Sequence, residues 1–289
     1  MKLSIETLSI CNKFGDIKAF QLIKQAGYDA IDMTYTKPTA DNFEDDLRWG
    51  ENYVEYAKTL RAELDRLNLE CVQAHAPIVI KYEDELNENN QNYKKVVRCI
   101  HSASILGAKY IVVHAVGVPD GVDLLEYNLK LYNSFIPYLE KYGIKMGVEN
   151  LCVYLGVGKW GSRFGRPEEL SELVNLLDEK YFVACIDLGH AALNYGTAED
   201  FIRDMNVGDR IKMLHVQESD FVRDSHNFPY SGGYKWDEIL KNLKEKGYKG
   251  DFSFEIFKVF EFLPNELVLD ALIFTEKIGR FLIDKFSNL

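Results

Sequence analysis

The sequence lacks the features of a membrane-spanning or exported protein. Its 289 residues contain no uninterrupted apolar run of the roughly 18 residues that a transmembrane helix needs. The segment Met1–Glu6 has no basic region, apolar core or small-residue cleavage site, so no signal peptide is expected. We therefore expect a cytoplasmic protein that does not enter a membrane.

Cysteine is scarce and is not arranged for cross-links. The five cysteines are Cys11, Cys71, Cys99, Cys152 and Cys185. They are odd in number, and none forms a Cys-x-x-Cys pair. This pattern argues against a disulfide framework or a thiolate zinc site, and it predicts reduced thiols that serve as small core residues.

Basic residues are in deficit. The chain has 34 lysines and arginines against 45 acidic residues, which gives a formal net charge of −11. Such a charge repels phosphodiester backbones and anionic lipid surfaces, although it is compatible with a local basic patch. Nucleic acid and membranes are therefore not the expected partners.

The chain has no Pro/Ser-rich linker and no low-complexity tract, so residues 1–289 are expected to form one domain. Short apolar runs alternate with helical patterns along its whole length. The strand-like runs are Lys2–Ser9, Ala30–Met33, Glu70–His75, Tyr110–His114, Lys145–Glu149, Phe182–Asp187, Ile211–His215 and Asp251–Ile256. The helical stretches include Trp49–Leu67, Tyr93–Leu106, Leu124–Tyr142, Pro167–Leu177 and Trp236–Lys246, and several stretches stop at a glycine (Gly27, Gly107, Gly143, Gly247).

This alternation predicts an α/β fold with a parallel sheet. The run Val183–Ile186 is too apolar to alternate between a wet and a dry face, so both faces of the sheet should be buried. An open doubly wound sheet would usually carry a glycine-rich phosphate turn after the first strand, whereas Ser9–Lys13 contains no glycine. We therefore predict a single-domain (β/α)8 TIM barrel, with the open sheet as the alternative.

The ends of the predicted strands carry residues that can bind metals. In a (β/α)8 barrel, the active site lies at the C-terminal ends of the strands. Six predicted strands end in such residues: His75, His114, Glu149, Asp187, His215 and Glu255. Three further candidates, His190, Asp224 and His226, follow strand ends, and only His101 among the six histidines lies elsewhere.

A divalent metal explains this gathering. A single histidine or carboxylate after an apolar run is usually structural, but converging carboxylates raise one another's pKa unless a cation neutralises them. Mixed imidazole and carboxylate ligands suit Mn²⁺ or Zn²⁺, with Co²⁺ or Fe²⁺ as alternatives, whereas Mg²⁺ and Ca²⁺ favour oxygen ligands alone. Binding should weaken at low pH, because these ligands must lose protons first.

The ordered set of motifs resembles the xylose isomerase-like TIM-barrel superfamily over nearly the whole chain. The motifs are His-Ala-Pro (His75), Val-Val-His (His114), Val-Glu-Asn (Glu149), Ile-Asp-Leu-Gly-His (Asp187, His190), Leu-His-Val (His215), Asp-Ser-His (Asp224, His226) and Gly-Tyr-Lys-Gly before Phe-Glu (Glu255). This superfamily holds sugar and sugar-phosphate isomerases and epimerases, inosose dehydratases, and abasic-site nucleases of the endonuclease IV type.

The resemblance implies two different ligand sets. In the epimerases, the residues matching Glu149, Asp187, His215 and Glu255 hold one divalent metal, and the two glutamates also serve as acid and base. In the nucleases, these positions and those matching His75, His114, His190, Asp224 and His226 hold three zinc ions. This sequence matches at all nine positions.

Two features favour sugar chemistry over DNA cleavage. The segment Gln217–Asp224 has three acids to one base, whereas a nuclease needs basic loops. The following Ser231-Gly232-Gly233 replaces the Pro-Gly-x-Gly turn that is common in the family. We predict a metal-dependent isomerase or epimerase of a sugar or sugar phosphate. The alternatives are a zinc phosphodiesterase acting on abasic-site DNA, a polyol dehydratase of the inosose type, and a non-catalytic binder.

In the predicted reaction, Glu149 and Glu255 act on opposite faces of the sugar as base and acid, through an enediolate that the metal stabilises. Asp187 and His215 complete the ligand set, and His190 contacts a substrate hydroxyl. The remaining candidates, His75, His114, Asp224 and His226, either bind the far end of the sugar or hold additional metals.

Two further segments carry expectations. The loop 156–166 has three cations and two aromatic residues, and it either closes over the substrate or serves as an exposed connector. Its Trp160 is expected to stack on a sugar ring, and its Arg163, with Arg223 of a later loop, to line the substrate site. The apolar segment Leu263–Leu289 should close the barrel as its last helix, and it is a candidate surface for a homodimer.

Overall fold

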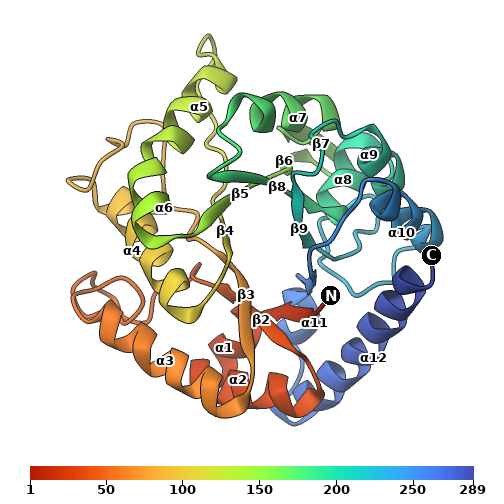
Figure 1. Cartoon of the computed structure of the whole chain (residues 1–289), viewed down its shortest axis with the longest axis horizontal. Helices are drawn as coiled ribbons and strands as arrows, with labels where there is room; N and C mark the ends of the chain where they lie inside the picture. The colour runs from red at the N-terminus through yellow and green to blue at the C-terminus, as the bar shows by residue number, and fades with distance from the viewer.

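Eight parallel strands occupy the centre of the molecule, and a ring of helices surrounds them (Figure 1). The computed structural model describes residues 1–289. The barrel strands are β1 (Leu3–Glu6), β2 (Ala30–Thr34), β3 (Glu70–His75), β4 (Tyr110–Val112), β5 (Lys145–Glu149), β8 (Phe182–Asp187), β9 (Ile211–His215) and β10 (Phe252–Phe254). Their spatial order is β10-β1-β2-β3-β4-β5-β8-β9. Val216 closes the ring, because its N–H donates to the Ser253 carbonyl at 2.8 Å and its carbonyl accepts from the Glu255 N–H at 3.2 Å. The predicted single-domain (β/α)8 barrel is confirmed.

The strands are buried on both faces, as their composition predicted. Every residue of β1, β2 and β8 is buried. Inside the barrel, a small apolar cluster from β4, β8 and β9 contains Val112, Val183, Cys185 and Met213. A much larger cluster fills the space between the strands and the helices. The barrel interior is therefore a packed core, and polar side chains gather at the C-terminal ends of the strands.

The helices follow the strands around the ring. They are α1 (Leu8–Phe14), α2 (Asp16–Ala26), α3 (Tyr53–Leu67), α4 (Gln91–Leu106), α5 (Leu124–Ser134), α6 (Ile136–Tyr142), α7 (Pro167–Leu176), α8 (Leu188–Tyr195), α9 (Ala198–Asp204), α10 (Trp236–Glu245), α11 (Phe257–Glu261) and α12 (Val268–Ser287). A 3₁₀ turn, η1, spans Asn265–Leu267. Helices α2, α4 and α6 end at glycines in the left-handed conformation, as predicted. None of the helices combines the length and apolar character that crossing a bilayer requires.

Several predicted boundaries were wrong. Strand β4 ends at Val112 and not at His114, β10 spans Phe252–Phe254 and not Asp251–Ile256, and α3 begins at Tyr53 and not at Trp49. The first strand ends at Glu6 and not at Ser9, because Leu8 already begins α1. The stretch Leu124–Tyr142 is two helices and not one. Pro137 lies in the first turn of α6 and lacks the N–H that would continue the hydrogen-bond ladder of α5.

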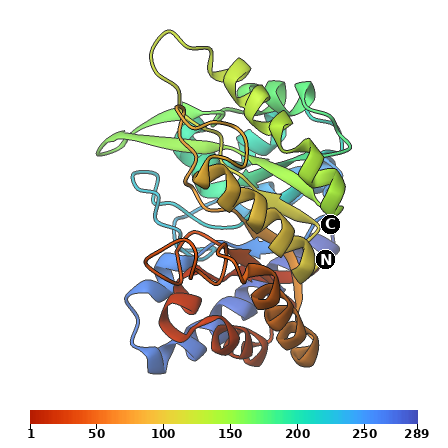
Figure 2. The same cartoon turned by 90° about the vertical axis from the view of Figure 1, so that its left-hand side faces the viewer.

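The segment after β5 is a β-hairpin, which corrects the prediction of a loop. Strands β6 (Leu151–Gly156) and β7 (Lys159–Arg163) pair antiparallel outside the barrel. Figure 2 shows this hairpin and the loop after β9 projecting from the same side of the molecule. The indole Nε1 of Trp160 donates a hydrogen bond to the Val222 carbonyl at 3.0 Å, so the hairpin is attached to the β9 loop.

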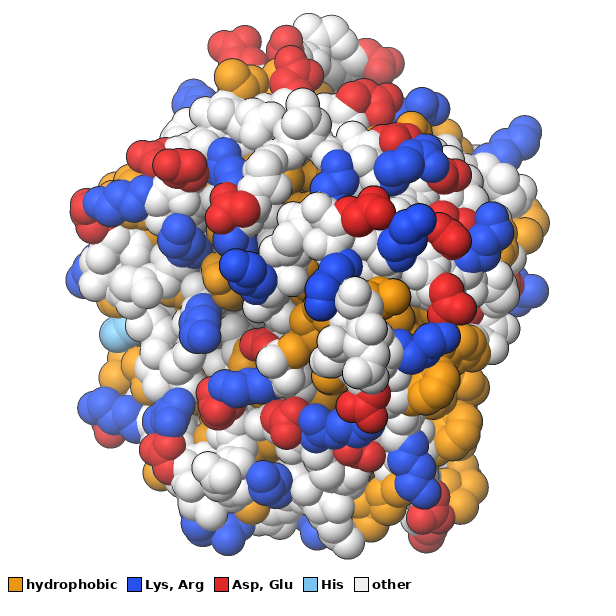
Figure 3. Space-filling view, turned by 45° about the vertical axis from the view of Figure 1, so that its right-hand side comes forward, with side chains coloured by type: hydrophobic (Ala, Val, Ile, Leu, Met, Phe, Trp, Pro, Cys, Tyr) orange, Lys and Arg blue, Asp and Glu red, His pale blue; other side chains and the backbone are white.

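The C-terminal helix closes the ring, as predicted. Helix α12 packs against β1, α2 and α10. It approaches β1 closely at Gly279, where a Cβ atom would lie 2.4 Å from Cδ1 of Leu3. Phe274 and Phe281 of α12 remain about half exposed, and homodimer formation stays a prediction. On the face shown in Figure 3, acidic and basic side chains are mixed, so the net charge of −11 forms no single patch there.

A buried ion pair holds the segment between β2 and α3 against the barrel. The Arg48 side chain is 6% exposed, and its Nη2 lies 2.7 Å from Oδ1 of Asp16 on α2. Its Nη1 donates to the Lys37 carbonyl at 3.0 Å. The pair therefore joins the loop after β2 to a helix of the outer ring.

Arg48→Met should lower the free energy of unfolding by about 3–5 kcal/mol, because it leaves the Asp16 carboxylate buried without its cation. Urea unfolding followed by circular dichroism would measure the loss. The matched control is Arg203→Met on α9, whose exposed guanidinium pairs with Asp200 and Asp204. That change should cost less than about 1 kcal/mol. Equal losses in the two variants would show that the buried pair has no special role.

Candidate metal centre

Four strands bring one acidic or imidazole side chain each to a single point in the barrel mouth. The residues are Glu149 of β5, Asp187 of β8, His215 of β9 and Glu255 directly after β10, and we call them the tetrad. One ligand atom from each lies within 4.8 Å of those of the other three. His215 Nδ1 is 3.0 Å from Glu149 Oε1 and 3.2 Å from Glu255 Oε2. The structure thus assembles the four residues that the resemblance assigns to one metal.

Local hydrogen bonds explain why Asp187 sits where it does. Asn150 follows Glu149 and bonds the Asp187 backbone twice, with its Oδ1 accepting from N at 2.8 Å and its Nδ2 donating to O at 2.9 Å. Asp187 is also the N-cap of α8, and its Oδ1 accepts from the His190 N–H at 2.6 Å. The end of β5 and the end of β8 are therefore fixed relative to each other.

The ionisable groups of the tetrad shift one another's pKa values. Burial raises the pKa of Asp187 to about 7, and the carboxylates of Glu255 and Glu149 add to this effect. Burial also acts to raise the pKa of Glu149, but His215 and His114 outweigh it and hold that pKa well below its usual range. The same balance, with His215 dominant, brings the pKa of Glu255 to about 2. Glu149 and Glu255 are thus held ionised beside His215, whereas burial opposes the charge of Asp187.

Unpartnered atoms in the tetrad fit a bound cation. Glu149 Oε2, Glu255 Oε2 and His215 Nε2 are buried and make no hydrogen bond of good geometry, and the two oxygens have only imidazole nitrogens beside them, at 3.0 and 3.2 Å. Buried polar atoms normally have partners, because leaving one unpaired costs roughly 1–3 kcal/mol. A divalent cation would provide the missing interactions for the two carboxylates. The mixed imidazole and carboxylate donors suit the transition metals that the sequence predicted, Mn²⁺ or Zn²⁺ first, whose identity stays a prediction.

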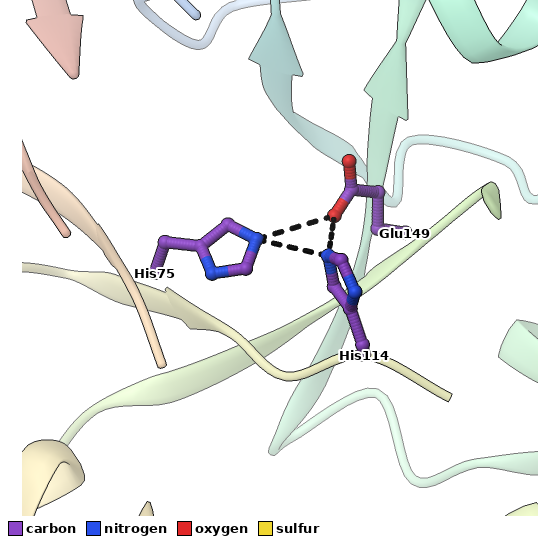
Figure 4. A group of neighbouring side chains, drawn as sticks. All are labelled: His75, His114 and Glu149. Atoms are coloured by element: carbon purple, nitrogen blue, oxygen red, sulfur yellow. Dashed lines mark hydrogen bonds and ion pairs between the residues drawn. The ribbon is translucent and has the colours of Figure 1, made fainter. Parts of the chain in front are cut away.

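A second ligand group adjoins the tetrad and shares Glu149 with it. Figure 4 shows His75 and His114 pointing toward the Glu149 carboxylate. His114 Nε2 lies 3.0 Å from Glu149 Oε2, and His75 Nε2 lies 3.7 Å from the same oxygen. The two Nε2 atoms are only 2.9 Å apart. Two imidazoles that face one carboxylate oxygen could hold an additional ion.

A third group lies on the hairpin side of the mouth and contains Cys152, His190 and Asp224. His226 is close by, with its Nε2 3.0 Å from Asp224 Oδ2. Four of the five cysteines are buried as predicted, but Cys152 begins the hairpin and is half-buried. The prediction that the thiols serve as small core residues therefore does not hold for Cys152. All nine predicted ligand positions lie in the mouth.

The predicted substrate-loop residues line a cavity beside these groups. The cavity measures about 870 Å³, and Trp160, Arg163, Arg223 and His114 are among its lining residues. A cavity of about 430 Å³ lies over Glu149 and Glu255 and also contains His114. Arg223 is largely exposed and pairs with Asp220 at 3.4 Å. The stacking role of Trp160 and the substrate roles of the two arginines stay predictions.

The loop after β9 exposes less negative charge than its composition predicted. Glu218 is fully buried, and its carboxylate accepts hydrogen bonds from the indole of Trp236 and the backbone N–H groups of Tyr230 and Gly232. The Glu218 carboxylate is therefore paired inside the protein. Of the three acids in Gln217–Asp224, only Asp220 is well exposed. The loop does not present the acidic surface that its composition implied.

Asp32 is a residue of the site that sequence reasoning missed. It lies inside β2 and is fully buried, with Oδ2 accepting from Gln73 Nε2 at 2.6 Å and from Ser253 Oγ at 3.1 Å. The same oxygen lies 3.7 Å from His215 Nε2, on the ring edge opposite the nitrogen that faces the tetrad. This separation is too long for a hydrogen bond, so Asp32 acts on the His215 imidazole through its negative charge. A charged residue in the otherwise apolar Ile31-Asp32-Met33 was the available signal.

Two more residues were missed at strand ends. Glu6 lines the cavity over the tetrad, and burial raises its pKa to about 8. Its carboxyl group is therefore protonated at neutral pH and can donate a hydrogen bond. Gln217 Nε2 bridges the carboxylates of Asp187 and Asp224 at 3.0 and 3.2 Å. A Cβ atom on Gly189 would lie 2.1 Å from that nitrogen, so the glycine is needed there.

The protein is a (β/α)8 barrel whose candidate metal ligands cluster at the C-terminal ends of its strands, where the active sites of such barrels lie. The family model for the xylose isomerase-like TIM barrel matches residues 20–277, and the chain belongs to this family. The uncharacterized protein MJ1311 of Methanocaldococcus jannaschii is 31% identical over 239 residues, which are 78% of each chain.

Solved structures show the same fold at lower identity. A D-tagatose 3-epimerase-like protein superposes with a TM-score of 0.74 at 22% identity, over 100% of this chain and 99% of that one. The IolI protein, solved with a bound zinc atom, gives a TM-score of 0.68 at 21% identity over the same shares of the two chains.

Asp32→Asn should weaken metal binding about 10- to 100-fold, because it removes the negative charge behind the His215 ring. Competition with a chromophoric chelator would measure the affinity for Mn²⁺ or Zn²⁺. The control is Asp209→Asn, an exposed carboxylate that precedes β9 at the opposite end of the barrel. If Asp32→Asn bound metal as tightly as this control, that role of the Asp32 charge would be wrong.

Metal binding should release about one proton or more at pH 7 and should strengthen as the pH rises from 6 to 8. Burial alone would lower the pKa of His215, but neighbouring Cys185, Glu255 and Glu149 outweigh it and raise that pKa well above its usual value. The metal-free imidazole is then protonated at neutral pH, and an incoming ion must displace that proton. Calorimetry in two buffers of different ionisation enthalpy would count the protons. Binding without proton release would contradict this expectation.

Proposed function

We propose that this chain is a divalent-metal-dependent isomerase or epimerase of a sugar. The observation that carries the proposal is the tetrad, where two glutamates share one buried site with an aspartate and a histidine. Paired carboxyl groups beside one substrate can take a proton from a carbon and give one back. Moving or inverting a hydrogen next to a sugar carbonyl requires such a pair.

In this mechanism Glu149 and Glu255 exchange the proton. They extend from β5 and from the end of β10, so they would reach a bound sugar from different strands. One would take the proton from the carbon next to the carbonyl, and the other would return a proton to the opposite face. A divalent ion held by the tetrad would act as a Lewis acid toward the substrate oxygens and offset the developing negative charge.

Other residues of the chain would hold the substrate and restrict water. Glu6 lines the cavity over the tetrad and, as a neutral carboxyl group, would donate to a sugar hydroxyl. The hairpin lies over the neighbouring cavity through Trp160. Both cavities fall within the roughly 300–1,000 Å³ that small-molecule sites occupy.

The similar structures support this proposal. One is described as a D-tagatose 3-epimerase-like protein, and the IolI protein was solved with zinc. Their identities of 22% and 21% concern the fold, so the reaction is inferred from the tetrad.

A second candidate is zinc-dependent phosphodiester cleavage at abasic sites. The ligand groups His75-His114-Glu149 and Cys152-His190-Asp224 favour it, because they give room for more than one ion. Against it, the hairpin is attached to the β9 loop across the mouth, where a duplex would have to lie. Incubation with an abasic-site duplex would test this candidate. A polyol dehydratase would use the same residues and is distinguished by the loss of water from its product.

Glu149→Gln and Glu255→Gln should each lower turnover of the active sugar by about 100- to 10,000-fold, because each removes a proton-transfer group. The assay incubates the metal-loaded protein with a panel of ketoses in D₂O and follows product formation and deuterium uptake at the reacting carbon by NMR.

Glu168→Gln on the exposed surface of α7 is the matched control and should retain full activity. Metal content must be measured in every variant, because both glutamates are also expected ligands. Unchanged turnover in either tetrad variant would refute its acid–base role. Turnover without deuterium uptake would refute proton transfer through solvent-exchanging groups.

A further inference from the structure

Arg163 is a cation without a counter-charge at the entrance to the site. It ends β7 and is half-buried, and its one hydrogen bond runs from Nη1 to the Ala115 carbonyl at 3.3 Å. Burial lowers its pKa, and no carboxylate opposes this effect. The Arg48 guanidinium is instead paired with Asp16, whereas Arg210, away from the mouth, is also half-buried and bonds backbone carbonyls alone. Keeping a guanidinium half-buried without an anion costs free energy that the fold does not recover.

The backbone leaves room for this guanidinium. A Cβ atom on Gly117, in the loop after β4, would lie only 2.6 Å from Arg163 Nη2. The glycine therefore lets the planar group lie against the loop that follows His114. Arg163 and His114 both line the cavity of about 870 Å³ and a neighbouring one of about 390 Å³. His114 in turn reaches Glu149 of the tetrad at 3.0 Å, so the cavity connects the guanidinium to the metal centre.

The lining of the larger cavity is cationic in an acidic protein. Its charged side chains are Arg163, Arg223, Lys258 and Asp224. Asp224 already faces His226 at 3.0 Å, and Lys258 donates to the Asp224 backbone carbonyl and not to a carboxylate. Arg223 pairs with Asp220, so Arg163 and Lys258 remain free to meet an anion. The net charge of the chain is −11.

We propose that this cavity is a phosphate subsite and that the substrate is a phosphorylated sugar, with Arg163 binding the phosphate through its planar fork of donors. The inference rests on the proposed function for the sugar end, which lies at the tetrad. Arginine can contact two phosphate oxygens at once, and Lys258 adds a second positive charge. Two unpaired cations match a phosphate dianion better than a single carboxylate charge.

The test is calorimetric binding of D-fructose 6-phosphate, D-fructose and D-gluconate to the metal-loaded full chain. These probes differ in their anionic group, and binding needs no turnover. The phosphorylated sugar should bind at least about tenfold more tightly than D-fructose. Arg163→Met should lower that ratio about tenfold, since a hydrogen bond between charged groups is lost.

Gly117→Ala provides a second variant that keeps the arginine but displaces its guanidinium, and it should also lower the ratio. Arg203→Met on the outer helix α9 is the matched control and should leave the ratio unchanged. The two variants together separate loss of the contact from loss of the fold, which circular dichroism monitors.

Equal affinity for D-fructose and D-fructose 6-phosphate, or no measurable binding of either, would overturn the inference. An unchanged ratio in folded Arg163→Met would do the same, and tighter binding of D-gluconate would show a carboxylate subsite instead. A phosphate preference without turnover of any sugar phosphate would leave the subsite standing while the proposed function fails. Turnover of a sugar without tighter binding of D-fructose 6-phosphate would overturn the phosphate subsite while the proposed function stands.

Discussion

The structure of the mouth depends on one electrostatic constraint. Glu149, Asp187 and Glu255 converge where little water reaches them. His215 lies about 3 Å from Glu149 and Glu255, and His190 lies 3.6 Å from Glu149 and Asp187. Buried like charges at this distance repel unless a cation neutralises them. Other features of the mouth support this arrangement, including Asn150 between two strand ends and Asp32 behind His215. This arrangement fits the divalent cation that we propose for the tetrad.

The barrel explains how residues far apart in the sequence meet at this point. Parallel strands place their C-terminal ends at one mouth, so each strand contributes the residue with which it ends. The hairpin after β5 adds a different kind of element, since it carries Trp160 and Arg163 over the same mouth. The chemistry proposed for the tetrad and the recognition proposed for Arg163 therefore come from separate parts of the fold. The first belongs to the barrel and the second to an insertion in it.

The sequence predicted the barrel and the nine ligand positions because both leave short, local signals. Apolar runs buried on both faces mark the strands, and a histidine or carboxylate at the end of such a run marks the mouth. Residues whose role depends on a distant neighbour left no such signal. The role of Asp32 depends on its distance from His215 of another strand, which only the fold sets. Glu218 resembles a surface charge in the sequence, because its hydrogen bond with Trp236 is visible only in the structure. The thiol of Cys152 was missed because its nearness to His190 and Asp224 arises only from the fold.

Anomalous diffraction from crystals of the Mn²⁺-loaded protein tests the central claim most directly, because it places each ion without assuming its ligands. The account predicts one ion bound by Glu149, Asp187, His215 and Glu255. Three ions spread over all nine mouth residues would favour the phosphodiesterase instead. A mouth without any ion at saturating metal would contradict the claim that the tetrad is a metal centre.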